Sequence, residues 1–226
     1  TETSEINTAR YNGGSAGTYT GALIFGSNPP ASGVTEAWNG SAWTEVADLN
    51  TARYRAGGAG VSNTSALAFG GRNGPGTRYD NTETWNGSAW TEVNDLNNSR
   101  DEGGSNGTQT SAIFYGGTDP TRTADTETWN GSSWTEVNNL NDARAVGVAM
   151  GTQTAALYAG GNVGDRNEDW NGASWSEVAD LNTAREGGSP AGTSTLGLFG
   201  GGNIAPVTAA TEEWSQGQTI RSVDTD

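Results

Sequence analysis

The side chains of this chain that could perform chemistry are carboxylates, because histidine, cysteine and lysine are absent and all 11 basic residues are arginine. This composition excludes histidine bases, Ser-His-Asp triads, Schiff-base lysines, disulfides and metal sites built on His or Cys. Glycoside hydrolysis remains open, since it needs only two carboxyl groups held close together, one with a raised pKa. The candidate catalytic acids lie at the start of expected inner strands and are Asp101, Glu102 and Glu186. No feature of the repeat marks such a pair, so we expect no enzyme.

Acidic residues in loops could also supply oxygen ligands to calcium, a hard cation. The candidates are Asp80, Asp119, Asp125, Asp165 and Asp169. They lack EF-hand spacing, and scattered loop acids are usually solvated. We therefore expect no metal site and no cofactor.

Five arginines recur at nearly equal spacing and could bind an anion. They are separated by 43, 47, 44 and 41 residues: Arg10, Arg53, Arg100, Arg144 and Arg185. A ring of guanidinium groups around a channel mouth would suit an anion or a carboxylated sugar. With 26 acids against 11 arginines, internal pairing is the stronger expectation, either with a carboxylate such as Asp48 or Glu45 or with loop carbonyls.

Tryptophans recur in pairs around an Asn-Gly, as in WNGSAW (38–43). The complete set is Trp38, Trp43, Trp85, Trp90, Trp129, Trp134, Trp170, Trp175 and the unpaired Trp214. Exposed indoles could stack on sugars and would then form repeated lectin-like sites between blades. We favour a structural role, because a repeated aromatic is by default the shared core of stacked units, and this chain is poor in other large apolar residues.

The same residues define a repeat. The segment TEVADLNTAR (44–53) recurs in three variants, and the chain begins with the related TETSEINTAR (1–10). After each Arg come a glycine-rich stretch, an apolar run ending in a glycine pair, a variable loop, T-E-x-W, Asn-Gly and W-T-E-V. We expect four strands, a to d, joined as a meander, with Asn-Gly forming a type I′ turn between c and d. Helical periodicity is absent.

Five units of this length predict an all-β fold, a five-bladed β-propeller of four-stranded antiparallel blades in one domain. The glycines of strand a suit the crowding expected near the axis. The expected blades span 8–49, 51–96, 98–140, 142–181 and 183–226, the last joined by 1–7.

Ring closure can also be predicted. Because TETSEINTAR matches only the second half of a repeat, we expect residues 1–7 to pair with the strand containing Trp214, so that both termini share one blade. The C-terminal segment QTIRSVDTD (218–226) competes for the same edge.

The repeat resembles the kelch repeat along essentially the whole chain. The resemblance rests on the glycine pair that ends strand b, the Trp that ends strand c and the Trp that opens strand d. The Tyr frequent on strand c of kelch repeats is mostly replaced here by the T-E-x-W pattern. The WNGSxWTEV…LNTAR sequence pattern is most similar to that of kelch-type proteins of marine bacteriophages and bacteria. That resemblance implies structural and binding roles on a virion or an exposed surface, without catalysis.

Charge and hydropathy limit the partners. The net charge is −15 and no basic run exists, which argues against nucleic acid and anionic membranes as partners. No apolar run is long enough to cross a bilayer. We expect a virion, extracellular or cell-surface location.

The b–c loops differ between units, whereas the c–d turns are near copies. These loops are 27–33, 72–81, 118–126, 162–167 and 202–210, and they hold five of the six prolines. A rigid ring that varies its loops on one face is typical of a binding scaffold, although drift of unconstrained loops explains the variation equally well. The residues expected to bind are Arg72, Asn73, Arg78, Tyr79, Asp119, Arg122, Asp165 and Arg166.

These observations predict a non-catalytic structural and binding module that contacts a protein or glycan surface, other virion proteins included, through its b–c loops. A lectin with sites between blades is the first alternative. A carboxylate glycosidase is the second.

Overall fold

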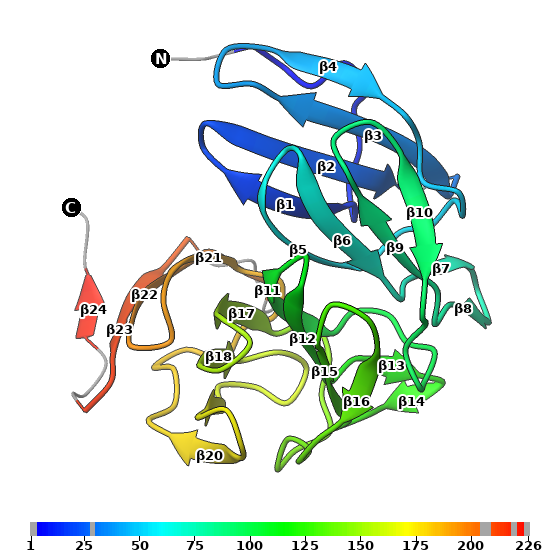
Figure 1. Cartoon of the computed structure of the whole chain (residues 1–226). Helices are drawn as coiled ribbons and strands as arrows, with labels where there is room; N and C mark the ends of the chain where they lie inside the picture. Colours follow the sequence, from blue (N-terminus) through cyan, green and yellow to red (C-terminus); the bar gives the residue numbers. More distant parts are fainter. Residues whose placement is uncertain (1–3, 28–29, 204–208, 218–220, 224–226) are drawn as a thin grey trace. The chain divides into compact units, whose positions relative to one another are not determined.

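The computed structural model of the chain describes residues 4–27, 30–203, 209–217 and 221–223. No described residue is helical, and the strands form five four-stranded antiparallel sheets, the blades of a five-bladed β-propeller (Figure 1). The described residues accordingly contain no helix that could cross a membrane. The predicted fold class is confirmed.

Contacts divide the chain into two compact units. The first runs from the N-terminus to Glu102 and includes Gly107–Ala112 and Trp129–Thr135. The second holds Gly103–Asn106, Ile113–Thr128 and the chain from Glu136 onward. The first two blades therefore lie in the first unit and the last two in the second, while the third blade contributes to both.

Each blade is a meander whose strands follow one another across the sheet, with the order a, b, c, d. The first blade consists of β1 (Gly14–Thr18), β2 (Gly21–Ser27), β3 (Ser32–Trp38) and β4 (Trp43–Val46). The second consists of β5 (Gly57–Ser62), β6 (Ser65–Phe69), β9 (Thr82–Trp85) and β10 (Trp90–Val93).

The other three blades repeat this order. The third consists of β11 (Gly104–Thr108), β12 (Ser111–Tyr115), β15 (Thr126–Trp129) and β16 (Trp134–Glu136). The fourth consists of β17 (Val148–Gly151), β18 (Ala156–Ala159), β19 (Asn167–Trp170) and β20 (Trp175–Val178). The fifth consists of β21 (Ser189–Gly192), β22 (Leu196–Gly200), β23 (Thr211–Ser215) and β24 (Arg221–Val223).

The c–d hairpins exist where Asn-Gly predicts them, but their turn differs from the predicted one. Trp38 pairs with Trp43 across four residues, and only Gly40 of the Asn-Gly pair has a positive φ, of 93°. Asn39 acts through its side chain, because Oδ1 accepts the backbone N–H groups of Ser41 and Ala42 at 2.9 and 3.0 Å. The type I′ prediction is therefore wrong, and the asparagine caps a wider turn.

The small residues of strand a leave room for aromatic rings of strand b. A Cβ added at Gly57 would lie 2.2 Å from Cε2 of Phe69, and one added at Gly147 would lie 2.4 Å from Cε2 of Tyr158. Neither separation is physically possible without a shift of the ring or the strand. These positions therefore require glycine.

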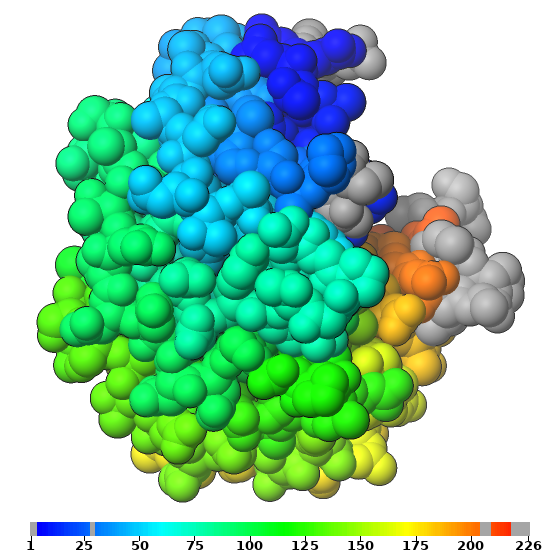
Figure 2. Space-filling view, turned by 90° about the vertical axis from the view of Figure 1, so that its right-hand side faces the viewer, coloured from blue at the N-terminus to red at the C-terminus, as the bar shows by residue number. Residues whose placement is uncertain are grey.

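The core consists of clusters between consecutive blades. In the first unit, Leu23 and Phe25 of β2 pack with Ala66, Ala68 and the tryptophans of the second blade. The atoms of these two blades, blue and cyan, are in continuous contact in the space-filling view (Figure 2). In the second unit, Leu157 and Ala159 of β18 similarly pack with Phe199 and Trp214. Within each unit, consecutive blades thus bury apolar faces against each other.

The last blade takes its outer strand from the C-terminal segment. β24 pairs with β23, with Thr211 opposite Val223 (Figure 1). The expectation that residues 1–7 occupy this edge is therefore wrong for residues 4–7, the part of that segment that the structure describes. Residues 1–3 lie outside the described part of the chain, whereas Ser4 Oγ donates to the Ser41 carbonyl and Asn7 Nδ2 donates to Glu36, both in the first blade. The N-terminal segment thus binds the blade that follows it, as its later copies do.

Candidate functional site

Seven of the eight paired tryptophans are buried in the fold, and Trp43 is half-buried. The two rings of each pair have centroids 5.4 or 5.5 Å apart. Trp85 Nε1 donates to the Asn63 carbonyl of its own blade at 2.9 Å, and Trp90 Nε1 donates to Thr35 Oγ1 of the preceding blade at 3.2 Å. Trp85 and Trp90 are 0% and 5% exposed, so neither ring offers a face to a sugar.

The repeated arginines form buried ion pairs. Arg53 Nη2 lies 2.5 Å from Glu83 Oε1, and Nη1 donates to the carbonyls of Gly70 and Asn81 at 3.1 and 2.7 Å. Both charged side chains are fully buried. The same pairing joins Arg10 to Glu36, Arg144 to Glu168 and Arg185 to Glu212. These four of the five repeated arginines pair internally, so their guanidinium groups are not available to an external anion.

The partner carboxylate differs from the one that the sequence suggested. Glu45 is exposed on β4, and Asp48 Oδ1 accepts the backbone N–H of Thr35 at 3.4 Å. The pairing carboxylate is the Glu of T-E-x-W, because strand c is buried between blades and the crossover arginine reaches it. Asp48 and Glu45 were therefore the wrong partners.

Sequence reasoning also missed the asparagine of the L-N motif. The backbone N–H and Nδ2 of Asn50 donate to Glu83 Oε2 at 2.7 and 2.8 Å. Asn141 binds Glu168 and Asn182 binds Glu212 in the same way. The signal was available, because both the Glu and the Asn recur in every repeat.

These contacts shift the pKa of one carboxyl group. Burial by itself would raise the pKa of Glu36, but donors from Asn7 and Thr8 and the charge of Arg10 outweigh it and hold the pKa below its ordinary value of 4.5. The carboxylate is therefore bound more favourably in the folded chain than in the unfolded chain.

A pH dependence of stability follows. Because the folded pKa is the lower one, the contribution of Glu36 is complete above about pH 5 and is lost as the pH falls through the folded pKa. We expect the free energy of unfolding, measured by urea denaturation, to fall below that pH. Glu36→Gln should make the fall shallower, whereas Glu45→Gln, at an exposed position, should leave its slope unchanged. An identical acid limb in Glu36→Gln and the parent would contradict this assignment.

The loop 72–81 builds a small hairpin of β7 (Arg72–Gly74) and β8 (Thr77–Arg78). Asp101, fully buried, holds both strands: its Oδ2 lies 3.1 Å from Arg72 Nε, and its Oδ1 accepts Arg78 Nε at 2.7 Å. The ring of Tyr79 lies beneath the Arg53 guanidinium, with the centroid 5.8 Å from Cζ. The structure thus brings Arg72, Arg78 and Tyr79 together, but each has an internal partner, whereas Asn73 is exposed.

The acids that could hydrolyse a glycoside also have partners within the protein. Asp101 has an arginine on each of its oxygens, and Glu102 pairs with Arg55. Glu186, in the second unit, accepts Asn203 Nδ2 at 3.5 Å, and the two residues exchange backbone hydrogen bonds. None of these contacts presents two carboxyl groups to one space.

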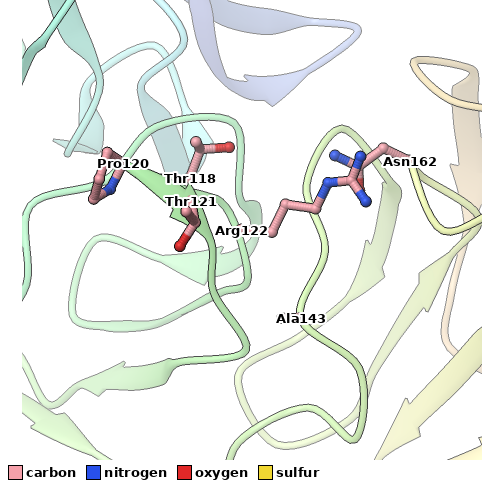
Figure 3. A pocket seen from close by; sticks show the side chains of 6 residues that line it. All are labelled: Thr118, Pro120, Thr121, Arg122, Ala143 and Asn162. Atoms are coloured by element: carbon pink, nitrogen blue, oxygen red, sulfur yellow. The ribbon is translucent and has the colours of Figure 1, made fainter.

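The loop 118–126 forms a second hairpin, of β13 (Thr118–Asp119) and β14 (Thr121–Arg122), beside an open pocket of about 600 Å³. The pocket is lined by Thr118, Pro120, Thr121, Arg122, Ala143 and Asn162 (Figure 3). Of the predicted binding residues, Arg122 lines it and Asp119 is exposed at the tip of the hairpin. Four of the other five lining residues lie in the b–c loops 118–126 and 162–167 that were expected to bind, whereas Ala143 belongs to a crossover that was not.

The loop 162–167 is attached to the crossover before its blade. Arg166 pairs with Asp142, and its carbonyl accepts Arg144 Nη1 at 2.6 Å. The carbonyl of Asp165 accepts the Leu181 N–H at 2.8 Å. Asp165 is exposed.

No group of three acidic residues close enough to hold a metal ion exists in the part of the chain that the structure describes. Burial raises the pKa of Asp169, one of the five calcium candidates. Gln216 Nε2 donates to its Oδ2 at 3.2 Å.

The fold and its repeated contacts define a β-propeller repeat protein. The chain matches no protein-family model and no curated protein sequence. The class of protein therefore rests on the five blades.

Proposed function

We propose that this chain is a non-catalytic, virion- or surface-associated binding module of kelch-type repeats that contacts a protein or glycan through its b–c loops. The observation that carries the proposal is that the additional structure of the chain lies in its b–c loops. Two b–c loops add hairpins beyond the four strands of a blade, β7–β8 and β13–β14, whereas the c–d turns are near copies. Rigid blades that carry variable, locally structured loops are suited to recognition.

The repeated residues support this division of roles. Trp90, Trp134 and Trp175 each donate to a threonine of the preceding blade, and Arg53 and its equivalents form buried ion pairs. These residues hold strands and blades together. What differs between the units is the loops, and these expose Asn73, Asp119 and Arg122. The b–c loops would therefore determine which ligand is bound.

Two observations weigh against the alternatives. Buried indole pairs do not suit a lectin that stacks sugars between blades. Asp101 does not suit an acid catalyst, because both of its oxygens face arginines and a general acid must hold a proton. The kelch assignment draws on the glycine pair after strand b and the tryptophans that end strand c and open strand d.

A loop exchange tests the proposal. The loops 72–81 and 118–126 would be exchanged for each other, and binding to a glycan array and to cell and virion surfaces would be measured. We expect the exchange to abolish binding that the parent shows. Replacing the turn 39–42 by 130–133, a near copy in another c–d turn, should leave that binding intact.

A hydrolysis screen completes the test. Incubation with a panel of glycosides should give no turnover. Turnover that disappears in the variant Asp101→Asn/Glu186→Gln would overturn the non-catalytic proposal, as would unchanged binding after the loop exchange.

A further inference from the structure

The pocket beside β13–β14 contains an arginine without a counterion. Arg122 is exposed on the pocket wall, and its guanidinium makes no ion pair or hydrogen bond with the described residues (Figure 3). Other arginines at or near the loops behave differently: Arg55, Arg72, Arg78 and Arg166 each pair with an acid.

The surroundings favour an anion at this point. In a chain of net charge −15, a guanidinium without an ion pair is an exception among the described side chains. The nearest acid of the facing crossover is Asp142, which precedes Ala143, and its charge is compensated by Arg166. An incoming carboxylate can therefore take both N–H groups of one edge of the Arg122 guanidinium in a bidentate pair.

The remaining lining residues suit a hydroxylated ligand. Asn162 Oδ1 accepts the Ala145 N–H at 3.0 Å, which fixes the amide, and its Nδ2 has no partner among the described residues. The Thr121 hydroxyl is likewise exposed without a hydrogen bond in the described chain. Pro120 and Ala143 add apolar surface of the kind that contacts the C–H face of a sugar ring.

We propose that this pocket binds an acidic monosaccharide unit, with the carboxylate on Arg122 and the ring hydroxyls on Thr121 and Asn162. The proposal rests on the binding role of the b–c loops and names the ligand class of one of them. The pocket is open on one side, so such a unit could be part of a longer glycan.

Calorimetric titration with D-glucuronate, D-galacturonate and D-mannuronate tests this assignment. The matched neutral hexoses and acetate are the comparison ligands. We expect at least one uronate to bind about tenfold or more tightly than its neutral hexose and than acetate, because each lacks part of the contacts. In Arg122→Gln the preference for the uronate should disappear. Arg55→Gln changes the net charge equally, outside the pocket, and should retain that preference.

Three results would overturn the inference: no uronate binding by the parent chain, equal binding of a uronate and its hexose or of a uronate and acetate, or an undiminished uronate preference in Arg122→Gln. The loop exchange separates this failure from that of the proposed function. Binding to neutral glycans or proteins that the exchange abolishes, but that Arg122→Gln leaves intact, refutes the acidic-sugar site alone. Surface binding that survives the exchange refutes the role of the loops.

Discussion

Trp90→Ala is expected to lower the free energy of unfolding by about 3–5 kcal/mol, as large-to-small changes in a packed core do. Trp90 is 5% exposed, its ring lies edge-on to Phe25 with centroids 5.1 Å apart, and its indole N–H binds Thr35 Oγ1. Removing the ring opens a cavity between the first and second blades and leaves the buried Thr35 hydroxyl without its donor. Urea denaturation followed by far-ultraviolet circular dichroism measures the loss.

The chain supplies a matched control for this change. Trp43 occupies the same position of the first blade, but it is half-buried, and its indole N–H has no partner within the described residues. Trp43→Ala should therefore cost about half as much or less, in proportion to the smaller buried area. Thr35→Val removes the hydroxyl that accepts from Trp90 and donates to the Gly33 carbonyl, and it should cost about 1–2 kcal/mol. Equal losses for Trp43→Ala and Trp90→Ala would show that the joint between blades does not depend on the second tryptophan.

Much of the fold could be predicted because the sequence repeats the parts that every blade needs. The tryptophan spacing and the glycine pairs mark strand ends, and the blade count follows from them. The turn type was wrong because Asn-Gly fits two turns, and the contact that decides between them, Asn39 Oδ1 with the N–H groups of Ser41 and Ala42, involves a side chain. The closing strand was wrong because two segments suit the same edge, and only the pairing of β24 distinguishes them.

The candidate site was less predictable. The partners of Arg10, Arg53, Arg144 and Arg185 lie 24–30 residues further along the chain, on strand c. Proximity in sequence therefore favoured Asp48 and Glu45 over Glu83. The pocket is harder still, because Arg122, Ala143 and Asn162 are ordinary residues of three connections that meet only in the folded second unit. No spacing or composition in the sequence indicates that these three residues line one pocket.

Arg53→Met is expected to cost about 3–5 kcal/mol of unfolding free energy, because it leaves a buried carboxylate without its cation. Glu83 is fully buried, and Arg53 contributes both the ion pair and the hydrogen bonds to the carbonyls of Gly70 and Asn81. Burial lowers the pKa of the Arg53 guanidinium, yet Glu83 opposes that shift, so the guanidinium stays charged at neutral pH. Urea denaturation at pH 7 measures the loss.

Two further variants separate the buried pair from arginine loss in general. Arg166→Met breaks a pair with Asp142 that is half-exposed, so it should cost far less than Arg53→Met. In the double variant Arg53→Met/Glu83→Gln no buried charge remains unpaired, and we expect it to be more stable than Arg53→Met alone. The recovery is limited, because the introduced amide has one oxygen where the carboxylate offered two to the donors of Asn50 and Thr51. A double variant no more stable than Arg53→Met would mean that the carbonyl contacts of Arg53, rather than its charge, hold the crossover in place.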